Sequence, residues 1–353
     1  MTPSMATQLV MDRNNRPIHA PQKLVTKSSV FTNAILNPDK ATAQKKRVSV
    51  ISLFAGCGGM DLGFIGGFEF LGKKYKRTAF DIIWANEINE AACATYRANI
   101  GDHIVTGDIW NVLDKLPNYA DVIIGGFPCQ DISINGKGAG VNGKRSGLYR
   151  AMVEAVARVA PKMFVAENVK GLLMRHNEKS LRQILADFRA LGYNVAEPQV
   201  YLAADYGVPQ LRERVFIVGT RSDIPEFTPP PPTCKKYISA KQAIGDLESL
   251  ELKPEFNHIW SLAQKSAEQG NRRLIADRPG YTIRAECHGN IQFHYSLPRR
   301  ISMREAARFQ SFPDNFTFIS KLRETERQVG NAVPPVMAWH VAQSVQALLK
   351  GSN

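Results

Sequence analysis

The sequence has few cysteines, and none of them lies near another. There are five, Cys57, Cys93, Cys129, Cys234 and Cys287, and no Cys-x-x-Cys pair occurs. This spacing does not suit a zinc site, so we expect no metal. An odd and scattered set also argues against a disulfide framework and favours a reducing compartment.

Long apolar runs are missing as well. No run approaches the roughly 18 residues that a membrane-spanning helix needs, and residues 1–46 lack the apolar core of a signal peptide. We therefore expect a cytoplasmic protein with no membrane partner. Hydrophobic residues make up 44% of the chain and charged residues 22%, the ordinary balance of a globular protein with a sizeable core.

Acidic residues are too few to balance the basic ones. The chain has 32 Asp and Glu against 45 Lys and Arg, a formal net charge of +13. A basic surface of this size predicts a polyanionic partner, most simply nucleic acid. A charge excess that only keeps the protein soluble is the alternative. Residues 1–46 are basic and show no regular period, so we expect a flexible extension there.

After residue 47, apolar strands alternate with helices. Strands are predicted at 48–54, 81–87, 103–106, 121–126, 162–166, 193–202 and 214–219, and helices at 60–65, 90–99, 147–159 and 178–191. This alternation predicts a doubly wound, largely parallel sheet. The segment Gly67 to Arg77 is predicted to be a polar insertion. Ligands of such sheets bind at the carboxyl ends of the strands.

Several chemically useful residues follow the predicted strands. A glycine-rich turn occupies residues 55–59, Glu87 and Asp108 end two strands, Cys129 follows a third and Glu167 a fourth. An acid at a strand end can bind ribose hydroxyls. The turn is not the dinucleotide fingerprint, because Asp61 stands where a third glycine is due; this disfavours a nicotinamide oxidoreductase.

Beyond four consecutive prolines at 229–232 the alternation stops. A short helix is predicted at 239–247, a basic helix at 299–310 and a C-terminal helix at 336–349. The loop-rich sequence between them indicates a second, smaller domain. The run Asn135 to Gly147 is rich in glycine and follows the Cys129 loop, which favours a mobile loop that closes over a substrate.

Eight motifs in order resemble those of the DNA (cytosine-5)-methyltransferase family. They are Leu53-Phe54-Ala55-Gly56-Cys57-Gly58-Gly59, Glu87, Gly107-Asp108-Ile109, Gly126-Phe127-Pro128-Cys129-Gln130, Glu167-Asn168-Val169, Gln210-x-Arg212-x-Arg214, the run from Arg304 to Pro313, and Gly330-Asn331-Ala332-Val333. Three departures occur. Ser52 replaces an Asp found in many members, Asp131-Ile132-Ser133 replaces a bulkier aromatic before the serine, and the insertion lengthens the gap to Glu87.

The resemblance implies an α/β fold: a doubly wound, Rossmann-like S-adenosylmethionine-dependent methyltransferase domain with a smaller target recognition domain. The expected domains are the extension at 1–46, the catalytic domain at 47–220 plus 328–353, the recognition domain at 221–298 and a connecting hinge and helix at 299–327. The implied reaction transfers a methyl group from S-adenosylmethionine, as co-substrate, to C5 of a flipped cytosine in a specific duplex sequence.

The resemblance also implies roles for individual residues. The catalytic set is Cys129, which attacks C6, Glu167, which shares a proton at N3, and Arg212 and Arg214 of the cytosine pocket. The donor set is Phe54, Ala55, Gly56, Gly58, Gly59, Glu87, Ile88, Asp108, Ile109, Pro128, Leu148, Asn331 and Val333. The DNA-contact set is Gln130, Ser133, Lys137, Lys144, Arg145, Arg272, Arg273, Thr282 and Arg284.

The expected partner is double-stranded DNA, bound by a monomer. The compact layout is typical of a bacterial restriction-modification enzyme, with a cognate endonuclease that acts on the same site without a stable complex. Two alternatives stay open: a tRNA cytosine-5 methyltransferase, and a catalytically silent DNA-binding module. The second would be expected to lose Cys129, Glu167, Glu87 or Asp108, and all four are present.

Overall fold

The computed structural model describes residues 47–128, 147–261, 272–285 and 292–351. The expected N-terminal extension, the Cys129 loop and the glycine-rich run after it lie outside these ranges. Site residues outside them are Cys129, Gln130, Ser133, Lys137, Lys144 and Arg145.

The central feature of the described chain is an eight-stranded sheet. Its parallel strands are β1 (Val48–Leu53), β4 (Phe80–Glu87), β5 (Ile104–Thr106), β6 (Val122–Gly126) and β7 (Met163–Val169). Antiparallel strands extend it beyond β7: β11 (Glu213–Arg221), with β8 (Tyr193–Val195) and β9 (Gln199–Leu202) paired to it. The order β5-β4-β1-β6-β7-β11-β8 reverses direction at β1, so a crevice is expected beside that strand.

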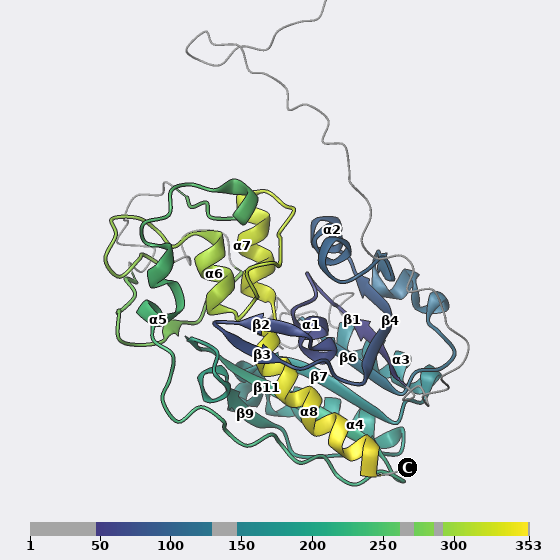
Figure 1. Cartoon of the computed structure of the whole chain (residues 1–353). Helices are drawn as coiled ribbons and strands as arrows, with labels where there is room; N and C mark the ends of the chain where they lie inside the picture. Colours follow the sequence, from purple (N-terminus) through teal and green to yellow (C-terminus); the bar gives the residue numbers. More distant parts are fainter. Residues whose placement is uncertain (1–46, 129–146, 262–271, 286–291, 352–353) are drawn as a thin grey trace, which may run out of the picture. The chain divides into compact units, whose positions relative to one another are not determined.

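Side chains alternate between two cores, one on each face of the sheet. On β6, Val122 and Ile124 join the first core, whereas Ile123 joins the second. The helices α1 (Gly59–Ile65), α2 (Glu90–Asn99) and α8 (Pro335–Gly351) pack into the first core; α3 (Leu148–Val159) and α4 (Glu178–Ala190) pack into the second. Figure 1 shows α8 running across the front of the strands. The doubly wound prediction is confirmed.

The segment predicted to be a polar insertion forms a β-hairpin with one buried apolar face. Strands β2 (Phe68–Phe70) and β3 (Lys73–Tyr75) pair antiparallel. Phe68 and Tyr75 are buried and stack with their ring centroids 5.0 Å apart, and Tyr75 meets Trp339 of α8 edge-on at 5.3 Å. The charged residues on its solvent face made the segment look polar in the sequence. Three aromatic rings form an apolar face on its other side.

A third core gathers the shorter helices. These are α5 (Ala240–Ile244), α6 (Met303–Phe309) and α7 (Leu322–Asn331), and the two-stranded pair β10 (Gln210–Leu211) and β12 (Gly280–Tyr281) lies beside them. The basic helix predicted at 299–310 begins only at Met303, because Ser302 and Glu305 form a capping box. Helix α7 was not predicted. The proposed domain boundaries stay a prediction.

Candidate active site

Four chain segments lie at the carboxyl edge of the parallel strands. The turn at 54–59 follows β1, Glu87 ends β4, Asp108 follows β5 and Pro128 follows β6. Strand β1 lies between β4 and β6 in the sheet. The topology therefore places the turn and Glu87 at the point where the strand order reverses, which is where open α/β sheets bind ligands.

Glu87 is tied to the turn by its carboxylate. One oxygen accepts a hydrogen bond from the Gly56 amide at 3.0 Å, and the other accepts from the Asn89 amide at 2.8 Å. Burial raises the pKa of Glu87, although these amide bonds oppose the shift. The neighbouring Ile88 is 68% exposed, an uncovered apolar side chain beside a half-buried acid. Together they offer a polar group and an apolar surface to a ligand.

The glycines of the turn serve two different purposes. Gly56 has φ +57°, and a Cβ built there would meet no atom within 4 Å. Gly58 has φ +90°, but its Cβ would fall 2.9 Å from the ring of Tyr96 and closer still to Ile100. Gly56 therefore faces open space that a ligand can enter, whereas Gly58 lets the turn lie against α2.

The remaining donor-set residues differ in how far they are exposed. Val333 is buried, and its carbonyl approaches Gly59 so closely that a Cβ there would lie 2.5 Å away. Asn331 and Pro128 are exposed, and Leu148 is half-buried at the start of α3. Asp108 is exposed and accepts a hydrogen bond from the Trp110 amide at 3.0 Å. Phe54 and Ala55 are half-buried, and Ile109 is buried in the second core.

Glu167 and Arg214 form an ion pair at the base of the Cys129 loop. Arg214 Nε lies 2.7 Å from Glu167 Oε1, and both side chains are about one-tenth exposed. A Cβ on Gly126 would lie 2.9 Å from Glu167 Oε2, so the acid lies beside the residue three before Cys129. Burial raises the pKa of Glu167, and the positive charges of Arg214 and Arg212 oppose that rise.

Asn168 is a residue to which the sequence assigned no role. Its side-chain amide donates to the Phe127 carbonyl at 3.0 Å and so joins the end of β7 to the segment that leads to Cys129. Its position directly after Glu167 was the available signal, since a buried amide at a strand end needs partners on a neighbouring segment.

Arg212 differs from Arg214 in its surroundings. It is fully buried, and its guanidinium donates to the carbonyls of Ile283 at 2.7 Å, Gly330 at 2.9 Å and Ala332 at 3.0 Å. The guanidinium of Arg212 is therefore bonded to main-chain carbonyls. This agrees with the expectation that Arg212 supports the pocket.

The DNA-contact residues in the described ranges are partly engaged by the protein itself. Arg273 donates to the His294 carbonyl at 2.9 Å, and Thr282 donates to the Leu211 carbonyl at 2.7 Å. The guanidinium of Arg272 lies 5.9 Å from the Tyr281 ring centroid. Arg272, Arg273 and Arg284 are exposed, so their charges face solvent.

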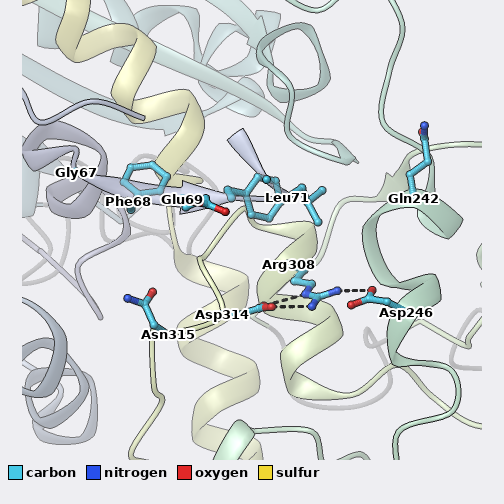
Figure 2. Close-up of a pocket in the computed structure, with 11 residues that line it drawn as sticks. Gly67, Phe68, Glu69, Leu71, Gln242, Asp246, Arg308, Asp314 and Asn315 are labelled. Carbon is cyan, nitrogen blue, oxygen red and sulfur yellow. Dashed lines mark hydrogen bonds and ion pairs between the residues drawn. The ribbon is translucent and has the colours of Figure 1, made fainter. Parts of the chain in front are cut away.

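A separate cavity of about 770 Å³ lies between the β2–β3 hairpin and helices α5 and α6. Figure 2 shows Arg308 there between Asp246 and Asp314, with Glu69 and Leu71 on the hairpin side. Arg308 bonds each carboxylate at 2.6 Å. No residue of the catalytic, donor or DNA-contact sets lines this cavity.

Two further properties concern the described part of the chain. No cluster of three or more His, Cys, Asp or Glu there could hold a metal ion. None of the helices within the described ranges has the length and apolar character of a membrane span.

Comparison with known proteins identifies the family. The model of the C-5 cytosine-specific DNA methylase family matches residues 48–281 and 255–347. The chain is 38% identical over 339 residues to the Type II methyltransferase M.NgoFVII of Neisseria gonorrhoeae, covering 86% of this chain and 87% of that one. It is 34% identical over 334 residues to the Type II methyltransferase M.BbvI of Brevibacillus brevis, covering 83% and 89%.

Solved structures agree on the fold. The S. pombe Dnmt2 methyltransferase aligns with a TM-score of 0.64 at 18% identity, over 87% of this chain and 100% of that one. The extent of the family match, together with the acid, cation and glycine turn at the carboxyl edge of the sheet, leads to one conclusion. The chain belongs to the C-5 cytosine-specific DNA methylase family and is a DNA (cytosine-5)-methyltransferase.

Proposed function

We propose that the carboxyl edge of the sheet binds S-adenosylmethionine beside a flipped cytosine and that Cys129 attacks the base. The observation that carries the proposal is the Glu167–Arg214 pair, which lies 2.7 Å apart beside Gly126 at the start of the Cys129 loop. An acid with a raised pKa and a fixed cation are the groups that a cytosine ring needs during nucleophilic addition.

The donor site fits the chemistry of S-adenosylmethionine. The open space at Gly56 gives room for the ligand, the Glu87 carboxylate suits ribose hydroxyls, and the exposed Ile88 and half-buried Phe54 suit an adenine ring. In this proposal Asp108 meets the adenine amino group, and Pro128, Leu148, Asn331 and Val333 complete the pocket. The bound donor supplies the methyl group.

The chain's own residues carry the other steps. The Cys129 thiolate adds to C6 of cytosine, while Glu167 holds a proton at N3 so that negative charge does not build up on the ring. Arg214 contacts the cytosine carbonyl, and Arg212 holds the adjacent main chain. After C5 has been methylated, it loses its proton to a base, and the re-formed double bond expels the Cys129 thiolate.

The target base must leave the duplex to reach this site, at a cost of a few kcal/mol. The loop after Cys129, with Lys137, Lys144 and Arg145, closes over it, and Gln130 and Ser133 contact the DNA beside it. Arg272, Arg273, Thr282 and Arg284 contact the duplex from the recognition region. Phosphate contacts fix the register of the protein on the duplex, and base contacts determine which sequence is recognised.

The protein acts as a monomer in the bacterial cytoplasm and protects sites cut by a cognate endonuclease.

Bisulfite sequencing of plasmid DNA treated with the purified protein and S-adenosylmethionine tests this function. We expect one cytosine within a fixed short sequence to become resistant to conversion. Labelled methyl transfer to duplex DNA should also exceed transfer to tRNA by a wide margin. Preferential labelling of tRNA, or no labelling of either nucleic acid, would contradict the proposal.

A further inference from the structure

A buried carboxylate behind the glycine turn has no part in the steps above. Asp61, in the first turn of α1, is fully buried. Ser52 of β1 donates its hydroxyl hydrogen to Asp61 Oδ1 at 2.8 Å, and Tyr96 of α2 donates to Asp61 Oδ2 at 2.7 Å. Burying a carboxylate is costly unless each oxygen has a partner, and here two hydroxyl groups from two other elements provide them.

The bonds converge on Asp61, which accepts from Ser52 at one oxygen and from Tyr96 at the other. The Tyr96 hydroxyl has a single hydrogen, which it gives to Asp61, so its 2.9 Å contact with His103 Nε2 is one in which His103 donates. His103 lies just before β5 and packs edge-on against the Tyr96 ring, with centroids 5.5 Å apart. The chain His103, Tyr96, Asp61, Ser52 thus links α2, α1, β1 and the approach to β5.

This chain touches the turn through the Tyr96 ring. A Cβ on Gly58 would lie 2.9 Å from Tyr96 Cδ2, so the ring supports the turn from below. The Gly58 amide donates to the Ala55 carbonyl at 2.9 Å, and the Gly56 amide donates to Glu87 at 3.0 Å. A shift of Tyr96 would therefore move Gly58, and with it the main chain on which Gly56 and Glu87 depend.

We propose that Asp61 is a positioning residue for the methyl donor, because its carboxylate fixes Tyr96 and Ser52 and so holds the 54–59 turn in its binding shape. Ser52 stands where many family members have Asp, and its hydroxyl oxygen lies 2.8 Å from Asp61 Oδ1. The carboxylate that β1 lacks is thus supplied from α1 across this bond. The inference rests on the proposed donor site.

Exchange of the two side chains is the test. The variants are Ser52→Asp, Asp61→Ser and the double variant Ser52→Asp/Asp61→Ser, and the readouts are the Kd for S-adenosylmethionine by calorimetry and the Kd for duplex DNA. We expect each single change to weaken donor binding by about tenfold or more, because it removes or doubles a buried charge. The double variant should return to within about threefold of wild type.

Tyr96→Phe tests the same chain without altering a buried charge. It keeps the ring beneath Gly58 and removes only the hydroxyl group, so it should raise the KM for the donor severalfold while kcat at saturating donor stays near wild type. Tyr119→Phe is the matched control, because it removes a hydroxyl that bonds Asp121 at 2.6 Å outside the donor site. The donor KM of this control should not change.

Three results would overturn the inference. One is a double variant in which the two single effects simply add. Another is an unchanged donor KM in Tyr96→Phe. This result would overturn the positioning role of Asp61 even if the charge variants fail to fold. Wild-type protein that binds no donor would overturn the proposed function together with the inference, whereas donor binding by wild type with an additive cycle overturns the inference alone.

Discussion

At the scale of single residues, the molecule keeps two acids in different surroundings at the same edge of the sheet. Glu87 is held by main-chain amides, which suits a fixed hydrogen-bonding group. Glu167 is held by a cation and has a raised pKa, because its burial outweighs the charges of Arg214 and Arg212. An acid in such surroundings can hold a proton for a substrate, so we expect Glu167 to act in proton transfer and Glu87 in binding.

Replacement of Glu167 by glutamine should separate this role from stability. Glu167→Gln keeps the size of the side chain and removes its ionisable carboxyl group, so we expect kcat for DNA methylation to fall by about 10²- to 10⁴-fold. The matched control is Glu213→Gln, at a half-exposed acid whose partner is Lys170 at 2.8 Å. Labelled methyl transfer measures both variants, and a loss of less than tenfold in Glu167→Gln would contradict the role.

Asp61 should give folding stability a distinct pH dependence. Its pKa is raised by burial from 3.8 to about 6, so between these values the folded protein retains a proton that the unfolded chain has lost. Stability therefore falls as pH rises through this window, and a shift of this size corresponds to roughly 3 kcal/mol.

Urea denaturation of wild type and Asp61→Asn at several pH values measures this effect. Because asparagine does not titrate, the free energy of unfolding of wild type relative to the variant should decline from about pH 4 to about pH 6. His103 titrates in both proteins and so contributes little to the difference. A difference that stays constant across this range would show that Asp61 has an ordinary pKa.

At the scale of elements, the β2–β3 hairpin anchors the first core beside α8. Tyr75 packs against Phe68 and Trp339 and is 3% exposed. We expect Tyr75→Ala to lower the free energy of unfolding by about 3 kcal/mol, through lost apolar contact and a residual cavity. Lys74→Ala, at an exposed site on the same strand, should change it by less than about 0.5 kcal/mol. If urea denaturation showed a loss of stability in Tyr75→Ala as small as that in Lys74→Ala, the hairpin would not anchor the core.

At the scale of the whole molecule, Arg212 joins segments that are far apart in the sequence. Its three bonds reach Ile283, Gly330 and Ala332 from the corner between β10 and β11. Lysine cannot reproduce this planar set of donors. We expect Arg212→Lys to lower the free energy of unfolding by about 2 kcal/mol or more. Arg221→Lys, at the other end of β11, should have almost no effect, and a similar loss in both variants would contradict the linking role.

The sequence predicted the parallel part of this molecule well, because buried parallel strands are continuous apolar runs that end in glycine or acidic residues. Val48–Leu53 and Val122–Gly126 are found almost where they were expected. The predicted strand at 193–202 is two strands, and β11 runs antiparallel to β7. Strand direction depends on which neighbour is paired, and a strand's own residues do not record it.

The parts that could not be predicted depend on distant contacts. The hairpin at 68–75 has strands of three residues, too short for a period, and its aromatic face is explained only by Trp339. The Ser52–Asp61 bond joins two residues that the sequence did not connect. Ser52 stood out only as a departure from the family pattern, and Asp61 only as an acid in the first turn of a helix. For the site, the motifs predicted Glu167 and Arg214 in one pocket, and the structure adds their 2.7 Å pairing.

The central claim, a covalent bond between Cys129 and C6 of cytosine, has one direct test. The protein is incubated with S-adenosylmethionine and a duplex carrying 5-fluorocytosine at the methylated position that bisulfite sequencing identifies. Fluorine cannot leave C5 as a cation, so the enzyme should stay attached to the methylated base. We predict a denaturant-resistant adduct whose mass is the sum of the protein and the 5-fluorocytosine strand plus a net CH2, because the thiol loses its proton as the methyl group is added. Peptide mapping should locate the bond at Cys129. The Cys129→Ala protein should form no adduct. Wild-type protein that methylates ordinary DNA but forms no adduct, or Cys129→Ala protein that methylates at a near wild-type rate, would contradict the account.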